Sequence, residues 1–476
     1  MELNTNLPTV TIGPVIGKVD ENSARILLEL DRETEITISL KKINQIQILN
    51  QKTENNLNEE NEKFSQTNLC TNKHPKIFVF KGLTPSTKYE VIIENKVNFL
   101  NSELNSLKSS FTTTSTEGNS PDKFNLGFIS CNSAKYYKTL EKTEFSLWEN
   151  LSKKVKNNEI NYLIHMGDQI YIDDGAWKGN HENCYSKGIK LWKESFKKVY
   201  GKEMGTIDNA NEKADLDYEY FSKEKDEEFS QEKIRLEKEI IEFISQEYRE
   251  NWNIKAIAET LRNAPNLMIL DDHEIYDDFG FIGQTYFDQN SFEHFFADKA
   301  RFCYYKYQKQ LNEDIDFDNY SIAEKEHHYH IINGVGIFVQ DFRGCFTWLK
   351  NEDNNGTKGK LDGFLGKRQT EDILKCFGKD GIFEKMKYAF YVSANPLIFF
   401  SSLITNLAKE KVNDCYEQWA FAAQDEQIEL LDILVDFKKR SNVDTMLISG
   451  DVHLGCFTSI FKNEEYVLQQ MITSPI

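Results

Sequence analysis

The sequence predicts two structural units: an N-terminal β-sandwich over residues 1–114 and an α/β domain over residues 124–476. β-Branched and aromatic runs, broken by turn residues, fill the first part. In the second part, short apolar runs that end in polar residues alternate with helical periodicity. The polar stretch between them, residues 115–123, contains Gly and Pro and is expected to be a linker.

The strands of the sandwich are expected at five β-branched or aromatic runs. They are residues 9–12, 24–28, 35–40, 77–80 and 89–93. The segment from Leu83 to Tyr89 is typical of a tyrosine corner, in which a buried ring hydroxyl bonds to backbone upstream. Residues 50–61, rich in Asn, Gln and Glu, are expected to form a mobile loop. Together these features indicate an immunoglobulin-like or fibronectin-like sandwich.

The strands of the α/β domain are expected at five apolar runs. They are residues 124–129, 162–165, 266–270, 335–339 and 445–448. Ligand sites of α/β sheets lie beyond the carboxyl ends of the strands, so functional side chains are expected there. Residues 202–251 are rich in Lys and Glu, and residues 231–244 within them have apolar side chains at helical spacing. This stretch predicts a solvated helical insertion that covers one side of the domain.

Four of these strand ends carry side chains that bind metals or move protons. They are Phe128-Ile-Ser-Cys-Asn132, His165-Met-Gly-Asp-Gln-Ile-Tyr171, Leu270-Asp-Asp-His-Glu274 and Ser449-Gly-Asp-Val-His-Leu454. Carboxylate oxygens and an imidazole that converge from separate strands suit a two-metal site for phosphoryl chemistry. The residues expected to form this site are Asp168, Tyr171, Asp272, His273, Asp451 and His453.

The motifs Gly167-Asp-Gln-Ile-Tyr171, Asp271-Asp-His-Glu274 and Gly450-Asp-Val-His453, in this order, resemble those of the calcineurin-like metallophosphoesterases. More narrowly, they resemble the PhoD-like alkaline phosphatase family, to which the pair Ser130-Cys131 and the segment Gln340-Asp-Phe-Arg343 are also similar. The resemblance implies an αββα sandwich behind the small β-sandwich. It also implies hydrolysis of phosphate monoesters, diesters or both, by a metal-bound hydroxide that attacks a phosphate held by two or more metal ions.

The resemblance further implies a role for each matching residue. The first strand lacks the Asp-x-His of most calcineurin-like enzymes, and Cys131 stands in that place. The family pattern implies Fe³⁺ bound by Cys131, Asp168, Tyr171 and His453. Asp168 would bridge to a second position completed by Asp272, Asp341 and Asp451, where oxygen ligands favour Ca²⁺, with Zn²⁺, Mn²⁺ or Mg²⁺ as alternatives. His273 would protonate the leaving oxygen or steady the phosphate, and Arg343 would clamp phosphate oxygens.

Other interpretations remain open at this point. Gly179-Asn-His-Glu182 spells the usual third motif of the superfamily, but it follows no apolar strand and leaves too little chain after Asp168 for a crossover. A non-catalytic or nuclease-like relative on the same scaffold is the alternative function. His165 is expected to be a core histidine, and His327, His328 and His330 to lie at an edge. Four further carboxylates are either calcium ligands or, as we prefer, solvated loop residues: Asp173, Asp174, Asp277 and Asp278.

Composition limits the partners. A formal net charge of −19 argues against a stable nucleic-acid partner, whereas bound metals would still let an acidic protein act on a small phosphate ester. The eight cysteines are scattered without paired spacing, which indicates free thiols in a reducing compartment. The N-terminal residues resemble no signal peptide and no apolar run is long enough to span a membrane, so a cytoplasmic protein is expected. Nothing in the sequence indicates the oligomeric state.

Overall fold

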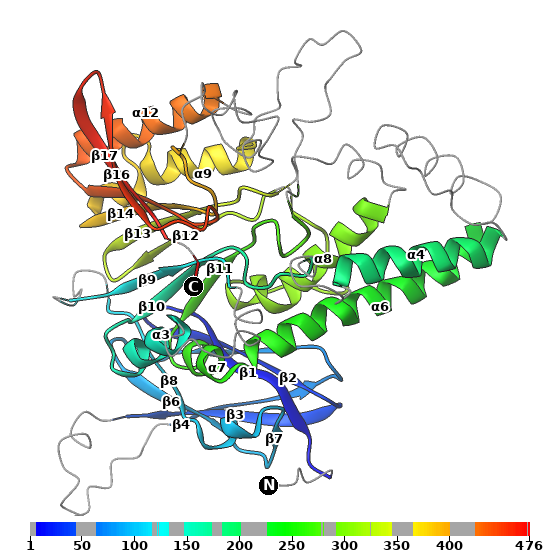
Figure 1. Ribbon diagram of the computed structural model, residues 1–476. Helices are drawn as coiled ribbons and strands as arrows, with labels where there is room; N and C mark the ends of the chain where they lie inside the picture. Colours follow the sequence, from blue (N-terminus) through cyan, green and yellow to red (C-terminus); the bar gives the residue numbers. More distant parts are fainter. Residues whose placement is uncertain are drawn as a thin grey trace, which may run out of the picture.

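The computed structural model describes residues 6–43, 63–116, 121, 123–132, 147–173, 183–200, 226–277, 279, 292–323, 325–344, 365–399, 424–473 and 475–476. It is a mixed α/β structure with several sheets (Figure 1). The sequence segments 50–61 and 202–225 lie outside the described residues.

The N-terminal part forms two four-stranded sheets, with strand orders β5-β2-β1-β7 and β4-β3-β6-β8. The strands are β1 (Thr9–Val19), β2 (Ser23–Leu30), β3 (Thr34–Lys42), β4 (Lys63–Cys70), β5 (Lys76–Lys81), β6 (Lys88–Ile93), β7 (Asn98–Phe99) and β8 (Ser109–Thr112), with the 3₁₀ helix η1 (Ser102–Ser106) before β8. All five strands expected here are present. β4, β7 and β8 were not predicted, because their sequences (KFSQTNLC, NF and SSFT) are polar or very short.

One hydrophobic core lies between these two sheets. It combines Ile26 and Phe78 of the first sheet with Ile38, Tyr89 and Phe111 of the second. The hydroxyl of buried Tyr89 accepts a hydrogen bond of 2.9 Å from the backbone N–H of Thr84. This contact confirms the predicted tyrosine corner, and it fixes the turn that leads into β6.

Two further sheets follow. A parallel sheet has the order β11-β10-β9, and a six-stranded sheet has the order β12-β13-β14-β15-β17-β16. Within the latter, β13, β14, β15 and β17 run parallel, and β12 and β16 are antiparallel edge strands. The strands are β9 (Leu126–Ile129), β10 (Tyr162–Met166), β11 (Asn266–Ile269), β12 (His328–Ile332), β13 (Val335–Gln340), β14 (Tyr388–Ser393), β15 (Asp444–Ser449), β16 (Cys456–Lys462) and β17 (Glu465–Ile472). All five strands expected here are present.

These two sheets face each other and are covered by helices on their outer sides (Figure 1). Ile164 and Leu267 of one sheet share a core with Ile337 and Ile448 of the other. The outer face of the six-stranded sheet packs against α9 (Lys367–Phe377) and α12 (Gln424–Ser441), beside the 3₁₀ helix η6 (Ile382–Lys385). The outer face of the three-stranded sheet packs against a second group of helices. They are α3 (Leu147–Lys156), α4 (Cys184–Tyr200), α6 (Asp226–Trp252), α7 (Lys255–Leu261) and α8 (Phe292–Tyr307), followed by η4 (Lys309–Leu311).

Helix α6 was expected to be a solvated insertion, and in part this was wrong. Leu236, Ile240, Ile244 and Tyr248 recur every fourth residue and are all fully buried in the core. This spacing puts them on one face of the helix, and that face packs against α4, α8 and β1. Most of the charged residues that dominate the composition lie on the remaining surface, with Glu232 and Arg249 as buried exceptions, so the charge content concealed a helix that belongs to the core.

The sheet that contains β1 and β2 is buried on both faces. Ile12, Val15 and Leu27 belong to the core formed with the helices, on the side away from the sandwich core. Glu29 on β2 forms a buried ion pair with Arg249 on α6, with 2.7 Å between Oε1 and Nε. The N-terminal sheets therefore pack tightly against the rest of the described chain.

In the part of the chain that the structure describes, no helix combines the length and the apolar character that crossing a bilayer requires.

Candidate metal centre

The predicted site residues lie on loops that follow the carboxyl ends of β9, β10, β11, β13 and β15. These loops have unusual backbone conformations. Cys131, Asp168, Asp451 and His453 have φ angles of +57°, +55°, +62° and +48°. Non-glycine residues rarely adopt this left-handed conformation, and such strain gathers at functional sites. All four are among the residues that the sequence motifs had indicated as metal ligands.

Gly167 and Gly450 let these loops approach one another. Gly167 has φ +94°, and a Cβ there would lie 2.4 Å from the Cβ of Asp271. A Cβ on Gly450 would lie 2.3 Å from Oγ of Ser130. Side chains at either position would push the neighbouring loop away, so each glycine is needed for close contact between two of the motifs.

Four carboxylates meet between these loops. One oxygen each of Asp168, Asp271, Asp272 and Asp451 lies within 4.8 Å of the others. A second, overlapping group with the same spacing contains Asp168, Asp272 and His273. The side chains of Asp168, Asp271 and Asp272 are buried, so water screens their mutual repulsion poorly. The structure thus brings together Asp168, Asp272 and Asp451 as predicted, and adds Asp271.

This repulsion is visible in the pKa of Asp168. Burial raises it well above the ordinary value, the nearby charge of His273 opposes the increase, and Cys131, Asp272 and Asp271 raise it further. Buried carboxylates this close together remain charged only if cations lie among them. The donor set therefore fits hard metal ions.

Tyr171 connects the first and last motifs. Its hydroxyl lies 3.3 Å from Oδ2 of Asp168 and 3.2 Å from Nε2 of His453. Its pKa is raised well above the ordinary value by burial, and then by the charges of Asp168, Cys131 and Asp272. The phenol hydroxyl therefore lies in the same electrostatic environment as the carboxylates.

Cys131 is completely buried beside the same cluster. Its Sγ lies 3.3 Å from Oγ of Ser130 and 3.6 Å from the carbonyl oxygen of Asp451. A negative charge on Cys131 would raise the pKa of both Asp168 and Tyr171. Among the described residues, however, the groups of acidic, histidine and cysteine ligand atoms that lie within 4.8 Å of one another include neither Cys131 nor His453.

His273 lies over the ring of Tyr171, with 4.1 Å between the ring centroids. Its Nδ1 is 2.8 Å from Oδ1 of Asp173, and its backbone N–H donates to Oδ1 of Asp168 at 3.3 Å. Burial alone would lower its pKa, but the charges of Asp272, Asp173 and Asp168 raise it well above the ordinary value. A protonated imidazole is therefore favoured beside the carboxylates.

Of the four further carboxylates considered, Asp173 is not a solvated loop residue. Its side chain is only 8% exposed and holds His273, whereas the side chain of Asp277 is 76% exposed. Asp173, His273 and Asp277 form a third group of possible ligand atoms within 4.8 Å of one another. Asp174 and Asp278, and the alternative motif at residues 179–182, lie outside the described residues.

Asp341 and Arg343 directly follow β13, and their predicted roles as ligand and phosphate clamp stay predictions. Both oxygens of buried Asp341 accept backbone N–H groups: Oδ1 those of Arg343 (2.9 Å) and Gly344 (2.7 Å), and Oδ2 that of Glu326 (2.7 Å). Such contacts are typical of a carboxylate that fixes a turn, and Asp341 belongs to none of the ligand groups found among the described residues.

The guanidinium of Arg343 is fully buried and faces the carboxylates. Its Nε donates to Oδ1 of Asp271 at 2.6 Å, Nη1 donates to the carbonyl of Phe279 at 3.1 Å, and Nη2 lies 3.5 Å from Oδ1 of Asp272. In this position Arg343 is a counterion to two carboxylates of the site, and its role as a phosphate clamp stays a prediction.

The sequence reasoning missed the role of Glu274. Its Oε2 accepts the backbone N–H groups of Asp168 (3.0 Å) and Asp271 (2.8 Å), and its Oε1 accepts that of Gln169 (2.5 Å). This single buried carboxylate therefore joins the loops after β10 and β11. The sequence did hold a signal for this role, because Glu274 lies three residues after Asp271 in a motif that begins at a strand end.

The remaining histidines behave as expected. His165 is buried between Gln169 and Asn266, at 2.7 and 2.8 Å, and burial lowers its pKa to about 4. His328 and His330 lie on the edge strand β12 and bond to each other at 2.8 Å. None of these side chains belongs to the ligand groups found among the described residues.

The four-layered arrangement of helices and sheets, with clustered carboxylates at the strand ends, is that of an α/β protein suited to hold metal ions. Among solved structures, the chain is similar to one described as the structure of PhoD. The TM-score is 0.58 at 12% sequence identity, and the match covers 98% of this chain and 77% of that chain. The chain therefore has a PhoD-like fold.

Other comparisons add nothing to this. A cycloisomaltooligosaccharide glucanotransferase from Paenibacillus sp., in complex with cycloisomaltoheptaose, matches with a TM-score of only 0.19 at 10% identity, over 95% of this chain and 55% of that one. No protein-family model matches the chain, and no curated protein matches it either.

The contact at Gly167 leads to a prediction about stability. Gly167→Ala should lower the free energy of unfolding by several kcal/mol, because its Cβ meets Asp271 in addition to the cost of a positive φ, roughly 1–2 kcal/mol. Gly82→Ala is the matched control, because Gly82 has φ +75° but nothing within 4 Å of the added Cβ. Urea unfolding of both variants measures the difference. Equal losses would mean that the loops after β10 and β11 do not need their close approach.

Proposed function

We propose that the chain hydrolyses phosphate esters at the loops after β9, β10, β11 and β15, with metal ions as cofactors. The observation that carries this proposal is the group of four carboxylates, Asp168, Asp271, Asp272 and Asp451, within 4.8 Å of one another on a PhoD-like fold. A site of this kind suits small esters rather than nucleic acid, because the net charge of the chain is −19. Monoesters and diesters are both within the proposed class.

The need for cations follows from charge. Arg343 neutralises part of the negative charge of Asp271 and Asp272, but Asp168 and Asp451 complete a group that is still strongly acidic. When bound, metal ions would attract the phosphate oxygens and make a water acidic enough to attack at neutral pH. The residues of the chain hold and orient those ions.

We assign the ligands to two positions. Cys131, Asp168, Tyr171 and His453 would hold Fe³⁺, which is supported by the short distances of the Tyr171 hydroxyl to Asp168 and His453. Asp168, Asp272 and Asp451 would hold a second, hard cation, with Ca²⁺ favoured over Zn²⁺, Mn²⁺ or Mg²⁺ because the donors are oxygens. Asp341 stays a predicted ligand of this position, and Asp271, which belongs to the group of four carboxylates, is a further candidate.

The proton donor in this proposal is His273. It lies over Tyr171 and next to Asp168, Asp173 holds its Nδ1, and its Nε2, which lies 3.8 Å from Oδ1 of exposed Asp277, is the nitrogen that would donate to a substrate. Arg343 is a positioning residue that orients Asp271 and Asp272.

The N-terminal sheets complete the proposal. We assign residues 1–114 to a fibronectin-like or immunoglobulin-like domain and residues 124–476 to the catalytic domain, with 115–123 between them. The tyrosine corner at Tyr89 supports the first assignment.

The metal assignment predicts that Asp168→Asn abolishes hydrolysis of 4-nitrophenyl phosphate and lowers the metal content, because one carboxylate is shared by both positions. Elemental analysis and turnover are measured on the same preparations. Asp444→Asn, at an exposed position at the start of β15, is the matched control and should keep both. Full turnover by Asp168→Asn would remove the proposed function.

Iron bound by a phenolate or thiolate should give the purified protein a charge-transfer colour in the visible range. Tyr171→Phe removes the hydroxyl that lies between Asp168 and His453, so the absorption band should shift or bleach. Absorption spectra are compared with the iron content of each preparation. An active protein that is colourless and free of iron would refute the iron assignment and leave the hydrolase proposal intact.

For His273→Ala we expect a rate loss of roughly 10²–10⁴ on an alkyl phosphate, which needs a proton on its leaving oxygen, and a smaller loss on 4-nitrophenyl phosphate. His294→Ala on α8 serves as the control for loss of an imidazole. Equal losses on both substrates would show that His273 steadies the phosphate instead of protonating the leaving group.

A further inference from the structure

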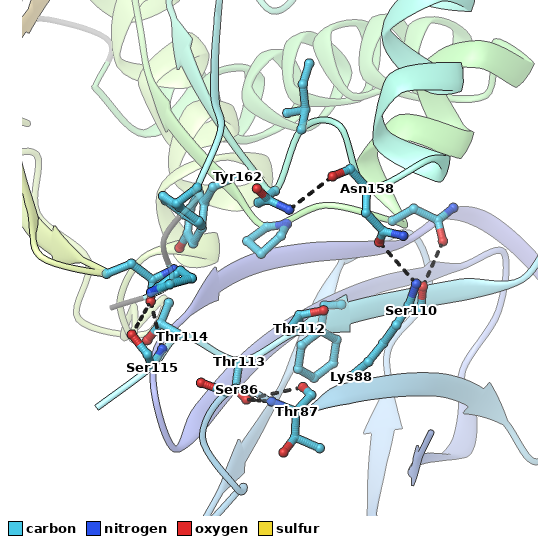
Figure 2. Close-up of a pocket in the computed structure, with 18 of the residues that line it drawn as sticks. Ser86, Thr87, Lys88, Ser110, Thr112, Thr113, Thr114, Ser115, Asn158 and Tyr162 are labelled. Carbon is cyan, nitrogen blue, oxygen red and sulfur yellow. Dashed lines mark hydrogen bonds between the residues drawn. The ribbon is translucent and has the colours of Figure 1, made fainter. Parts of the chain in front are cut away.

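A polar cleft lies at the other end of the parallel strands from the carboxylates (Figure 2). One wall comes from β6, β8 and residues 113–115 of the N-terminal part. The other comes from the end of α3 and residues 158–162, with Pro265 at the start of β11. The volume of about 700 Å³ is in the range of small-molecule sites.

The charge of this cleft differs from that of the whole chain. Lys42, Lys88, Lys123 and Lys156 line it, and its lining residues in the described part of the chain include no Asp or Glu. The chain as a whole carries 76 acidic and 57 basic residues. A carboxylate-free surface with four ammonium groups is therefore a local reversal of charge, which attracts anions.

Three of these lysines are available to a ligand. Lys42, Lys88 and Lys123 form no ion pair with a carboxylate within the described ranges, although Lys88 donates to Oδ1 of Asn158 at 3.3 Å. The remaining polar lining consists of hydroxyl and amide groups such as those of Thr112. These groups can bond to a phosphate or to the hydroxyls of a polyol.

Carboxylates near the cleft already have partners. Glu259 pairs with Lys156 at 2.6 Å, and Glu159 pairs with Lys154 at 3.1 Å. Glu159 also interacts with the charge of Lys123 and offsets part of it, so Lys42 and Lys88 are the cleft lysines that these two carboxylates leave unaffected.

Hydrogen bonds fix the walls of the cleft: Lys88 on one wall donates to Asn158 on the other, as Figure 2 shows, and two further bonds tie the N-terminal wall to residues behind and beside the cleft. The backbone N–H of Ser110 on β8 donates to the carbonyl of Arg262 at 3.1 Å. Oγ of Ser115 donates to Oδ1 of Asn333 at 2.8 Å. The cleft is thus formed before any ligand arrives, which lowers the entropy cost of binding.

We propose that this cleft binds a small phosphate-bearing molecule at a site separate from the metal centre. The cleft meets β10 at Tyr162, its first residue, whereas Asp168 follows the last residue of that strand. Five residues of strand at ~3.3 Å each separate the two sites by about 16 Å. A small ester bound at the carboxylates cannot reach the lysines, so the cleft serves a second ligand. This inference does not depend on the proposed hydrolysis.

Calorimetric titration of the full chain tests this with two probes, inorganic tripolyphosphate and glucose 6-phosphate, and with glucose as the uncharged control. The double variant Lys42→Gln, Lys123→Gln should bind the preferred phosphate probe at least tenfold more weakly. Lys41→Gln, the neighbour of Lys42 that does not line the cleft, should bind like the wild type. Tighter binding of glucose 6-phosphate would identify a phosphorylated polyol, and tighter binding of tripolyphosphate an inorganic phosphate chain.

Two further measurements complete the test. The charge-preserving double variant Lys42→Arg, Lys123→Arg should retain binding, which separates charge from any change in folding. Turnover of 4-nitrophenyl phosphate should be the same in all these variants, so failure here is distinct from failure of the proposed function. Unchanged affinity in the glutamine double variant, or no binding of either phosphate probe to the wild type, would overturn the proposal.

Discussion

Mutual repulsion of buried carboxylates is the constraint around which the site is built. Asp168, Asp271, Asp272 and Asp451 come from three loops, and nothing in their own chemistry favours their approach. Other parts of the fold hold them in place. Glu274 ties two of the loops through backbone N–H groups, Arg343 offsets two of the charges, and left-handed backbone at Asp168 and Asp451 turns the loops inward. The site therefore lowers the stability of the fold through charge repulsion and backbone strain, and bound cations would offset the repulsion.

The sheets supply the rigidity that such strain requires. The two inner sheets share a core, and helices cover their outer faces, so each strand end is held by packing on both sides. The opposite ends of the same strands meet the N-terminal sheets and carry a surface of the reverse charge. The short parallel strands of the three-stranded sheet therefore have an acidic site at their carboxyl ends and a basic cleft at their amino ends.

Much of this was predictable from residue patterns, and the failures have physical causes. Apolar runs identified β9, β10, β11, β13 and β15 but missed the inner strands β14 and β17, and the positions of Asp168, Asp272, Asp451 and Tyr89 agree with their motifs. Edge strands such as β4 and β16 escaped, because half-exposed strands carry polar residues. Asp341 and Arg343 were assigned from the resemblance of a strand-end segment to the family, and the same position also suits a carboxylate that fixes a turn and a buried counterion. Whether an acidic side chain faces a metal or a backbone amide depends on loop conformation, which one sequence does not reveal.

The sheet of β1, β2 and β5 has apolar side chains on both faces, and this affects how the chain folds during synthesis. Its inner face is covered by β3 and β6, which leave the ribosome soon afterwards. The other face, with Ile12, Val15 and Leu27, has its partners in α6 and α8, which are translated much later. The nascent sandwich therefore exposes an apolar face, and the charge of Glu29 without Arg249, until α6 and α8 have been translated. Chaperones bind exposed surfaces of this kind, and such surfaces cause aggregation when chaperones are absent.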